Sequence, residues 1–196
     1  MERRAQLHRK TSETDVRVSL TLDGSGQAAI STQIGFFDHM LDHVARHGRF
    51  DLEVQCSGDL HVDQHHSVED VGLCLGQAFR DALADKKGIR RYGHAVVPMD
   101  EALASVSLDL SGRAYLVYMN PLEDRWAGSF PLDLVQVFLQ ALVDRAGATL
   151  HATVHTAHNP HHAAEALFKA LGRALREAVE LDPRTSDVPS TKGILE

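Results

Sequence analysis

Cysteine is scarce in this sequence, which contains only Cys56 and Cys74 among its 196 residues. The two lie far from the C-x-x-C spacing of redox and metal-binding motifs. Disulfides persist in oxidising compartments and are rare in the cytoplasm. The two residues therefore indicate free, buried thiols in a cytoplasmic protein.

The sequence also lacks a long apolar run and an excess of positive charge. No stretch is long and apolar enough to span a bilayer. The segment from Met1 to Thr14 is polar and basic and lacks the apolar core of a secretory signal. The formal net charge of -7 argues against a general nucleic-acid-binding surface. We therefore expect neither a membrane nor a nucleic acid as a partner.

The rest of the composition is ordinary for a globular protein, with 43% hydrophobic and 24% charged residues. The length suits one good-sized core, or two fused half-size units that share one. Histidine is the exception. Of the 13 histidines, five lie in three short motifs, at His39, His65–His66 and His161–His162.

Two of these motifs have the same form, H-H-x-x-E, and they lie 96 residues apart, at 65–69 and 161–165. In a helix, His65 and Glu69 are four residues apart and project from one face, whereas His66 points about 100° round the axis. One metal ion can be chelated by the first pair while the adjacent histidine reaches a second metal. Two such helices that face each other would form a symmetric two-metal site.

A doubled histidine can also be a surface pair or a satisfied core group, and short motifs often occur by chance. Here the flanking segments repeat as well, which favours metal binding and predicts two fused, similar halves. At an offset of 96 residues the identical pairs are His65/His161, His66/His162, Glu69/Glu165, Leu75/Leu171, Gly76/Gly172, Ala78/Ala174, Arg80/Arg176 and Ala82/Ala178.

Hydrophobic periodicity predicts the same kinds of element in both halves. Strands are expected over 15–22, 28–33, 50–54, 60–63, 95–97, 104–110, 114–119 and 150–156, and helices over 36–46, 65–87, 132–145 and 161–180. Helices that bury one face against mostly antiparallel strands form a two-layer α+β domain. We therefore expect one compact domain of duplicated half-domains, each a four-stranded mostly antiparallel sheet with two helices. The expected boundaries are 1–90 and 91–181, followed by an irregular tail over 182–196.

Motifs along nearly the whole chain resemble those of the imidazoleglycerol-phosphate dehydratase family. Besides the two H-H-x-x-E segments they include R-K-T-S-E-T (9–14), F-D-H-M-L (37–41), G-I-R-R-Y-G (88–93), P-M-D-E (98–101), D-L-S-G-R (109–113) and P-S-T-K-G (189–193). The resemblance implies a di-manganese hydro-lyase of histidine biosynthesis that converts imidazole glycerol phosphate into imidazole acetol phosphate. It also implies a symmetric homo-oligomer of 24 subunits with active sites at subunit contacts.

The resemblance further implies two sets of metal ligands. One set is His39, His66, His161 and Glu165, and the other is His65, Glu69 and His162. Imidazole and carboxylate suit several divalent metals, so manganese follows from the resemblance alone.

The second set departs from the family. Many members resemble V-E-H-F-F where residues 135–139 of this chain read V-Q-V-F-L. Val137 cannot bind a metal, so the second metal has three protein ligands unless Gln136, another histidine or water completes the set. An open position would also suit a metal that binds substrate.

For catalysis we expect Glu13 as the base, His47 as a second acid or base, and Glu165. Glu13 matches the family's substrate-contacting glutamate; without that match it would be interpreted as a solvated carboxylate at the start of a strand. His47 closes the predicted helix two turns after His39, where a cation would also be favoured by the helix dipole.

A phosphate group requires fixed cations and hydrogen-bond donors. Arginine suits bidentate contact with a phosphate, and lysine acts as a point charge. The substrate-binding residues that we expect are Glu13, His39, His47, Arg91, Arg113, Lys169, Ser190, Thr191 and Lys192. The alternatives are that Arg91 belongs to a plain turn and that the tail is disordered.

The carbon-bound proton that must be lost in this reaction is not acidic. Two metals on the ring nitrogens would hold the substrate as imidazolate, whose electron density can expel the neighbouring hydroxyl. A binuclear metallohydrolase acting on a phosphoester is the alternative enzyme, but it predicts carboxylate-rich ligands, and this chain offers five histidines and two carboxylates. A metal-storage or assembly protein would need no phosphate-binding cations.

Overall fold

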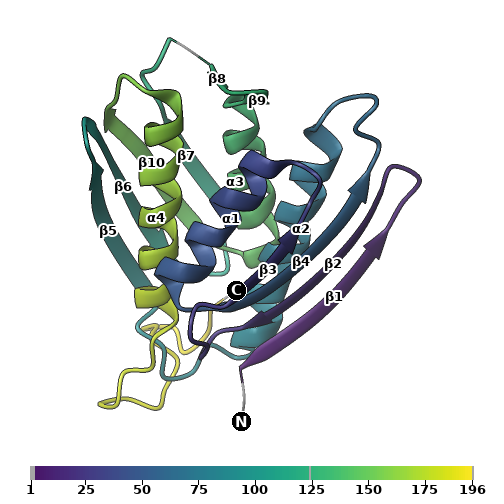
Figure 1. Ribbon diagram of the computed structural model, residues 1–196. Helices are drawn as coiled ribbons and strands as arrows, with labels where there is room; N and C mark the ends of the chain where they lie inside the picture. The colour runs from purple at the N-terminus through teal and green to yellow at the C-terminus, as the bar shows by residue number, and fades with distance from the viewer. Residues whose placement is uncertain (1–2, 124, 196) are drawn as a thin grey trace.

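The computed structural model describes residues 3–123 and 125–195 and consists of two similar halves (Figure 1). The elements of the first half are β1 (Arg4–Lys10), β2 (Thr14–Thr21), β3 (Ala28–Ser31), α1 (Gly35–Gly48), β4 (Asp51–Gly58) and α2 (His65–Leu83). Those of the second half are β5 (Tyr92–Met99), β6 (Ala102–Asp109), β7 (Tyr115–Met119), β8 (Trp126–Ala127), β9 (Phe130–Pro131), α3 (Asp133–Ala146), β10 (Thr149–Thr156) and α4 (Pro160–Val179).

The two large sheets have the same topology, with strand orders β1-β2-β4-β3 and β5-β6-β10-β7. In each sheet the first three strands pair antiparallel and the fourth pairs parallel. Alternate residues of β2 are buried, and Val18 lies opposite the buried Val54 of β4. The predicted α+β class, with duplicated halves and mostly antiparallel sheets, is confirmed.

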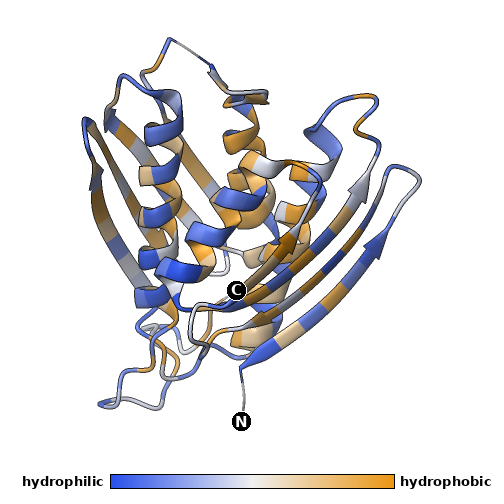
Figure 2. Ribbon diagram, in the orientation of Figure 1, coloured by the Kyte–Doolittle hydropathy of each residue, from blue (hydrophilic) through white to orange (hydrophobic). Residues whose placement is uncertain are grey.

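The four helices lie between the two sheets (Figure 1). Helix α2 packs on β1 and β2, and α4 packs on β5 and β6, while α1 crosses α4 and α3 crosses α2. The strands alternate between hydrophobic and hydrophilic residues (Figure 2), since one face of each sheet is buried. Phe138 of α3 contacts Phe37 of α1 at 5.4 Å and Phe168 of α4 at 5.5 Å between ring centroids. The halves therefore share one core.

The repeated glycines Gly76 and Gly172 mark the points where the helices cross. A Cβ atom at Gly172 would lie 2.8 Å from the carbonyl oxygen of Val44, and one at Gly76 would lie 2.3 Å from that of Leu142. Because only glycine permits such close approach, the same residue occurs at the same place in both halves.

The structure corrects the predicted strands at three places. The segment 60–63 is a turn, in which the N–H of Val62 donates to Asp59 at 2.8 Å. The fourth strand of the first sheet is instead β1, which we did not predict because it is an edge strand with mostly exposed, polar residues. The short β8–β9 hairpin was also not predicted.

Helix α2 ends at Leu83, four residues before the predicted end. Ala84 has a φ of 48°, and the chain then turns so that the buried ammonium of Lys86 donates to the carbonyl of Leu110 at 3.1 Å. None of the described helices is long and apolar enough to cross a membrane.

Candidate functional site

Each H-H-x-x-E motif lies at the beginning of a helix, where the side chain two residues before the first histidine accepts a hydrogen bond from the N–H of that histidine. The carboxylate of Asp63 accepts a hydrogen bond from the N–H of His65 at 2.7 Å, and the amide oxygen of Asn159 accepts one from His161 at 2.9 Å. The two neighbouring rings are nearly perpendicular in both motifs, with interplanar angles of 83° and 89°. The two imidazoles of each motif therefore face different neighbours.

Glu165 is the centre of a group of side chains from α1 and α4, which we call the Glu165 cluster: His39, His43, His161, Glu165 and Lys169. Its Oε2 atom lies 3.0 Å from Nε2 of His161 and 3.4 Å from Nε2 of His39. Its Oε1 atom lies 2.7 Å from Nζ of Lys169 and 3.2 Å from Nε2 of His43. Each carboxylate oxygen thus has its own two partners.

Glu165 is held in its ionised form by the groups around it. Burial opposes ionisation of Glu165, whose side chain is 9% exposed, but the hydrogen bond from Lys169 and the other neighbouring groups together outweigh it and lower the pKa of the carboxyl to about 2. Burial lowers the pKa of His43 to about 4. At neutral pH the cluster therefore contains an ionised carboxylate between the ammonium of Lys169 and the neutral imidazole of His43.

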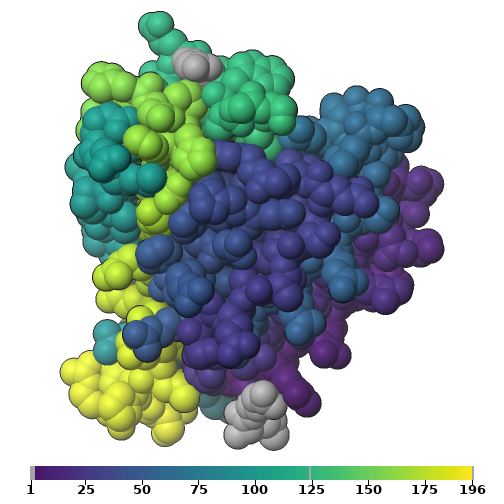
Figure 3. Space-filling view, in the orientation of Figure 1, coloured from purple at the N-terminus to yellow at the C-terminus, as the bar shows by residue number. Residues whose placement is uncertain are grey.

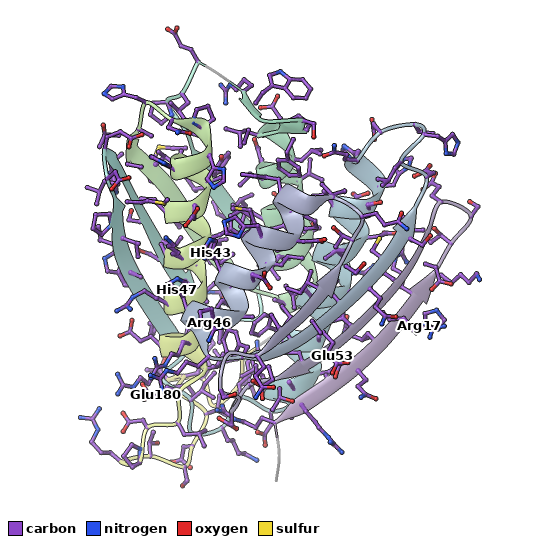
Figure 4. All side chains as sticks on the ribbon, in the orientation of Figure 1. Arg17, His43, Arg46, His47, Glu53 and Glu180 are labelled. Carbon is purple, nitrogen blue, oxygen red and sulfur yellow. The ribbon has the colours of Figure 1, made fainter. Side chains whose placement is uncertain are left out.

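His43 is a member of this cluster that we did not predict. Its ring lies 4.4 Å from that of His39 and 5.7 Å from that of His47, so three imidazoles follow one another along α1. Figure 4 labels His43 and His47, which lie on α1 beside α4. Burial, and after it the charge of Lys169, lowers the pKa of His47. The signal in the sequence was the spacing of four residues between successive histidines.

The second histidine of each motif is bound to a carboxylate through Nδ1. His66 lies 3.0 Å from Asp59, and His162 lies 2.8 Å from Glu101. These hydrogen bonds raise the pKa of both histidines, and the bond from His162 lowers the pKa of Glu101 to about 2. Metal-binding histidines are commonly held by a carboxylate in this way, with the other ring nitrogen directed at the metal.

Glu13, the expected base, lies beside the first motif. Its carboxylate is 3.9 Å from Nε2 of His66 and is about half exposed. Since Nδ1 of His66 is bound to Asp59, Nε2 is the nitrogen that faces Glu13. Glu101, which we had not assigned to the site, matches Asp59 as the carboxylate that orients a histidine.

The predicted metal-ligand sets are not complete within one chain. Among the described residues, groups of three ligand atoms within 4.8 Å of one another occur at His39, His43 and Glu165, and at Asp100, Glu101 and His162. Neither group contains His66 or the predicted pair of His65 and Glu69. The imidazole and carboxylate donors nevertheless suit a divalent first-row metal, and the bound Nδ1 atoms leave Nε2 free to coordinate.

The predicted phosphate-binding residues of the tail line one open cavity. It is lined by Arg91, Tyr92, Ser111, Arg113, Pro189, Ser190, Thr191, Lys192, Ile194 and Leu195. Arg91 is bound to both carboxylate oxygens of Asp109, at 2.7 and 3.1 Å, and donates to the carbonyl of Pro189 at 2.8 Å. It therefore holds the tail in place, while Arg113 is exposed.

Lys169 does not line this cavity, because its ammonium is bound to Glu165. The cavity lies at the other end of α4 from the Glu165 cluster. The N–H of Arg91 donates to the carbonyl of Ala178 at 2.9 Å, in the last turn of that helix.

The distance between the two ends is large. His161 and Ala178 are 17 residues apart in one helix, which corresponds to about 25 Å. In Figures 1 and 3 the yellow segment that follows α4 lies at the bottom, and the beginning of α4 lies at the top. One small molecule cannot touch both ends within a single chain.

Comparison with known proteins gives one consistent family. Residues 32–175 match the model of the imidazoleglycerol-phosphate dehydratase family. The chain is 57% identical to imidazoleglycerol-phosphate dehydratase of Moorella thermoacetica, with 100% of both chains covered. It is 55% identical to that of Jannaschia sp. (strain CCS1), with 98% of this chain and 100% of the relative covered.

Two solved structures of proteins with the same name have this fold. The crystal structure from Staphylococcus aureus has a TM-score of 0.83 at 36% identity and covers 91% of this chain and 99% of its own. The structure from Pyrococcus furiosus, in complex with (S)-C348, has a TM-score of 0.83 at 34% identity. The match covers 96% of this chain and 100% of the Pyrococcus furiosus chain.

Proposed function

Because the chain belongs to the imidazoleglycerol-phosphate dehydratase family, we propose that it dehydrates imidazole glycerol phosphate to imidazole acetol phosphate in histidine biosynthesis. The observation that supports this most directly is the Glu165 cluster, in which two imidazoles face one oxygen of a buried carboxylate. Since Cys56 and Cys74 are free and buried, we place the enzyme in the cytoplasm.

We propose two manganese ions per active site, held by the residues that the resemblance implies. His39, His161 and Glu165 of one subunit would form most of one site, completed by His66. His65, Glu69 and His162 would form the other. When bound, such ions supply Lewis acidity toward the nitrogens of the imidazole ring. Asp59 and Glu101 orient His66 and His162, so that Nε2 of each histidine is the free donor.

The proton transfers would belong to Glu13 and His47. Glu13 lies beside His66, and its half-exposed carboxylate can take the carbon-bound proton of the substrate. His47 has a lowered pKa, so it is neutral at physiological pH and can accept a proton before it donates one. In the tail cavity, Arg113 and Lys192 would bind the phosphate with the hydroxyls of Ser190 and Thr191.

The distance of about 25 Å along α4 supports a shared active site. A subunit whose metal ligands and phosphate cavity lie at opposite ends can use both only if each end joins a site with neighbouring subunits. We therefore propose a closed homo-oligomer in which every site combines at least two chains, with 24 subunits as the resemblance implies.

Turnover of imidazole glycerol phosphate tests the function. The metal-stripped protein should form imidazole acetol phosphate only after manganese is added, and Glu165→Gln should remain inactive with manganese present. Release of inorganic phosphate instead of the dehydrated product would support a phosphoester hydrolase. No turnover with any divalent metal would contradict the dehydratase proposal.

A further inference from the structure

His43 is the histidine of the Glu165 cluster to which the proposed function assigns no role. We infer that His43 is a positioning residue for metal binding: it holds Oε1 of Glu165 so that Oε2 alone faces the metal with His39 and His161. The inference rests on the proposed function, because metal binding at Glu165 is part of that proposal.

The division of the carboxylate is the first observation. Oε2 faces the nitrogens of His39 and His161, at 3.4 and 3.0 Å. Oε1 receives Nζ of Lys169 at 2.7 Å and Nε2 of His43 at 3.2 Å. With both donors in place Oε1 is saturated, and the carboxylate can offer a metal only its other oxygen.

The position of His43 beside His39 is the second observation. Their Nε2 atoms lie 3.2 Å apart, so one of the two nitrogens carries a proton that the other accepts. If the proton is on Nε2 of His43, that N–H has two possible acceptors: Nε2 of His39 and Oε1 of Glu165. Once the lone pair of His39 binds a metal, Oε1 is the acceptor that remains. Because the N–H bond lies in the plane of the ring, metal binding then requires only that the ring of His43 rotate from His39 toward Oε1, which is already 3.2 Å from its Nε2.

The other half of the molecule lacks this arrangement. Helices α1 and α3 begin at Gly35 and Asp133, which places Ala141 at the position of His43. The offset of 96 residues places Leu73 at the position of Lys169. Ala141 instead packs closely on α2, since a Cβ atom on Gly72 would lie 2.8 Å from the Cβ of Ala141. Glu69 therefore has neither donor, and His43 should act on only one of the two metals.

Metal titration tests the inference without reference to turnover. Manganese is titrated into the metal-stripped, full-length protein. Binding is measured by calorimetry and by the electron paramagnetic resonance signal of free Mn²⁺. The variants are His43→Leu, which removes the donor, and His43→Gln, whose amide N–H can replace that of Nε2. His155→Leu is the control, since His155 is exposed on β10 and bound to Ser105. Circular dichroism and particle size are compared for all four proteins.

His43→Leu should weaken one of the two manganese affinities about 10- to 100-fold and leave the other unchanged. The manganese affinities of His43→Gln should stay within about 3-fold of those of the unmodified protein, and the affinities of His155→Leu should equal them. Equal affinities in His43→Leu and the unmodified protein would overturn the inference and leave the proposed function intact. An equal loss in His43→Gln would also overturn it, because direct ligation by the imidazole would then explain the result. If the unmodified protein binds no manganese, the proposed metal site fails, and the inference with it.

Discussion

The carboxylate of Asp70 lies 2.9 Å from Nε of Arg9, and this ion pair joins the first H-H-x-x-E helix to the strand that leads to Glu13. Asp70 is buried and also accepts a hydrogen bond from the hydroxyl of Thr14. Thr11 closes the intervening turn, since its hydroxyl oxygen accepts from the N–H of Glu13 at 3.1 Å. The helix that carries His66 thus also sets the position of Glu13.

Asp70→Asn should lower kcat/KM about 10-fold without loss of metal, because the neutral amide holds Arg9 and Thr14 less strongly and leaves Glu13 less well placed. Steady-state kinetics and the bound metal content check this. Asp81→Asn, on the same helix and bound to the side chain of Gln77, is the matched control. A loss of metal from Asp70→Asn equal to its loss of activity would assign Asp70 to the metal site instead.

Changes at the proposed metal ligands and changes at the phosphate cavity should have different kinetic effects. Glu165→Gln and His66→Ala should abolish turnover, since the metals act on charge that develops during elimination. Arg113→Ala should mainly raise KM, because the phosphate lies away from the bonds that break. Equal losses of kcat in all three variants would contradict this division.

Mixed oligomers should show that active sites are shared between chains. At a low substrate concentration His66→Ala and Lys192→Ala should each have little activity alone. When they are co-expressed in equal amounts they should regain about one quarter of the unmodified activity, because a quarter of the sites then combine two intact contributions. The measurement is specific activity of the purified mixture at constant particle size. The comparison is a mixture of His66→Ala and Glu13→Ala, two residues that lie beside each other in one chain and so belong to the same contribution. No recovery in the first mixture would mean that both contributions come from one chain.

Val137→His should tighten the second metal site. Val137 is partly buried on α3, which packs on α2, and its repeat partner His39 lies 3.4 Å from Glu165. Position 137 should therefore face the metal bound by His65, Glu69 and His162. Metal titration should show two unequal affinities in the unmodified protein and two similar ones in the variant. Two equal affinities before the change would mean that another group already replaces the missing imidazole.

Asp51→Asn should destabilise the fold in a pH-dependent way. One carboxylate oxygen of Asp51 accepts hydrogen bonds from the N–H groups of Gln27, Ser25 and Gly26, at 3.0, 2.8 and 3.1 Å, and those of Gln27 and Ser25 do most to lower its pKa below the usual 3.8. A lowered pKa stabilises the folded state above about pH 4, and this stabilisation is lost as the pH falls through the folded-state value.

At pH 7 the change should lower the melting temperature by about 2–4 °C, corresponding to about 1 kcal/mol for a group that water partly screens. The difference from the unmodified protein should be smaller at about pH 2 than at pH 7. Glu53, which Figure 4 labels, has an exposed carboxyl on the same strand. Glu53→Gln should therefore change the melting temperature little at either pH. An equal difference at both pH values would show that charge on Asp51 is not the cause.

The fold class could be predicted because most of its signals are local. The two H-H-x-x-E motifs define helices whose side chains point in known directions, and the repeat of Gly76 at Gly172 follows from two equivalent helix crossings. The exceptions were elements without a periodic apolar pattern. Strand β1 is a polar edge strand, and the β8–β9 hairpin has strands of only two residues.

The sequence by itself determined which side chains share a helix face, because residues four apart in a helix are neighbours whatever surrounds them. Only the tertiary structure decided which helices cross. Although Lys169, which was expected at the phosphate, donates to Glu165 through the local spacing of their shared helix, the crossing brought His43 of α1 to the same carboxylate. It also placed the tail cavity at the far end of α4 from the metal ligands. Such contacts depend on how buried surfaces pack against one another, which spacing along the chain does not specify.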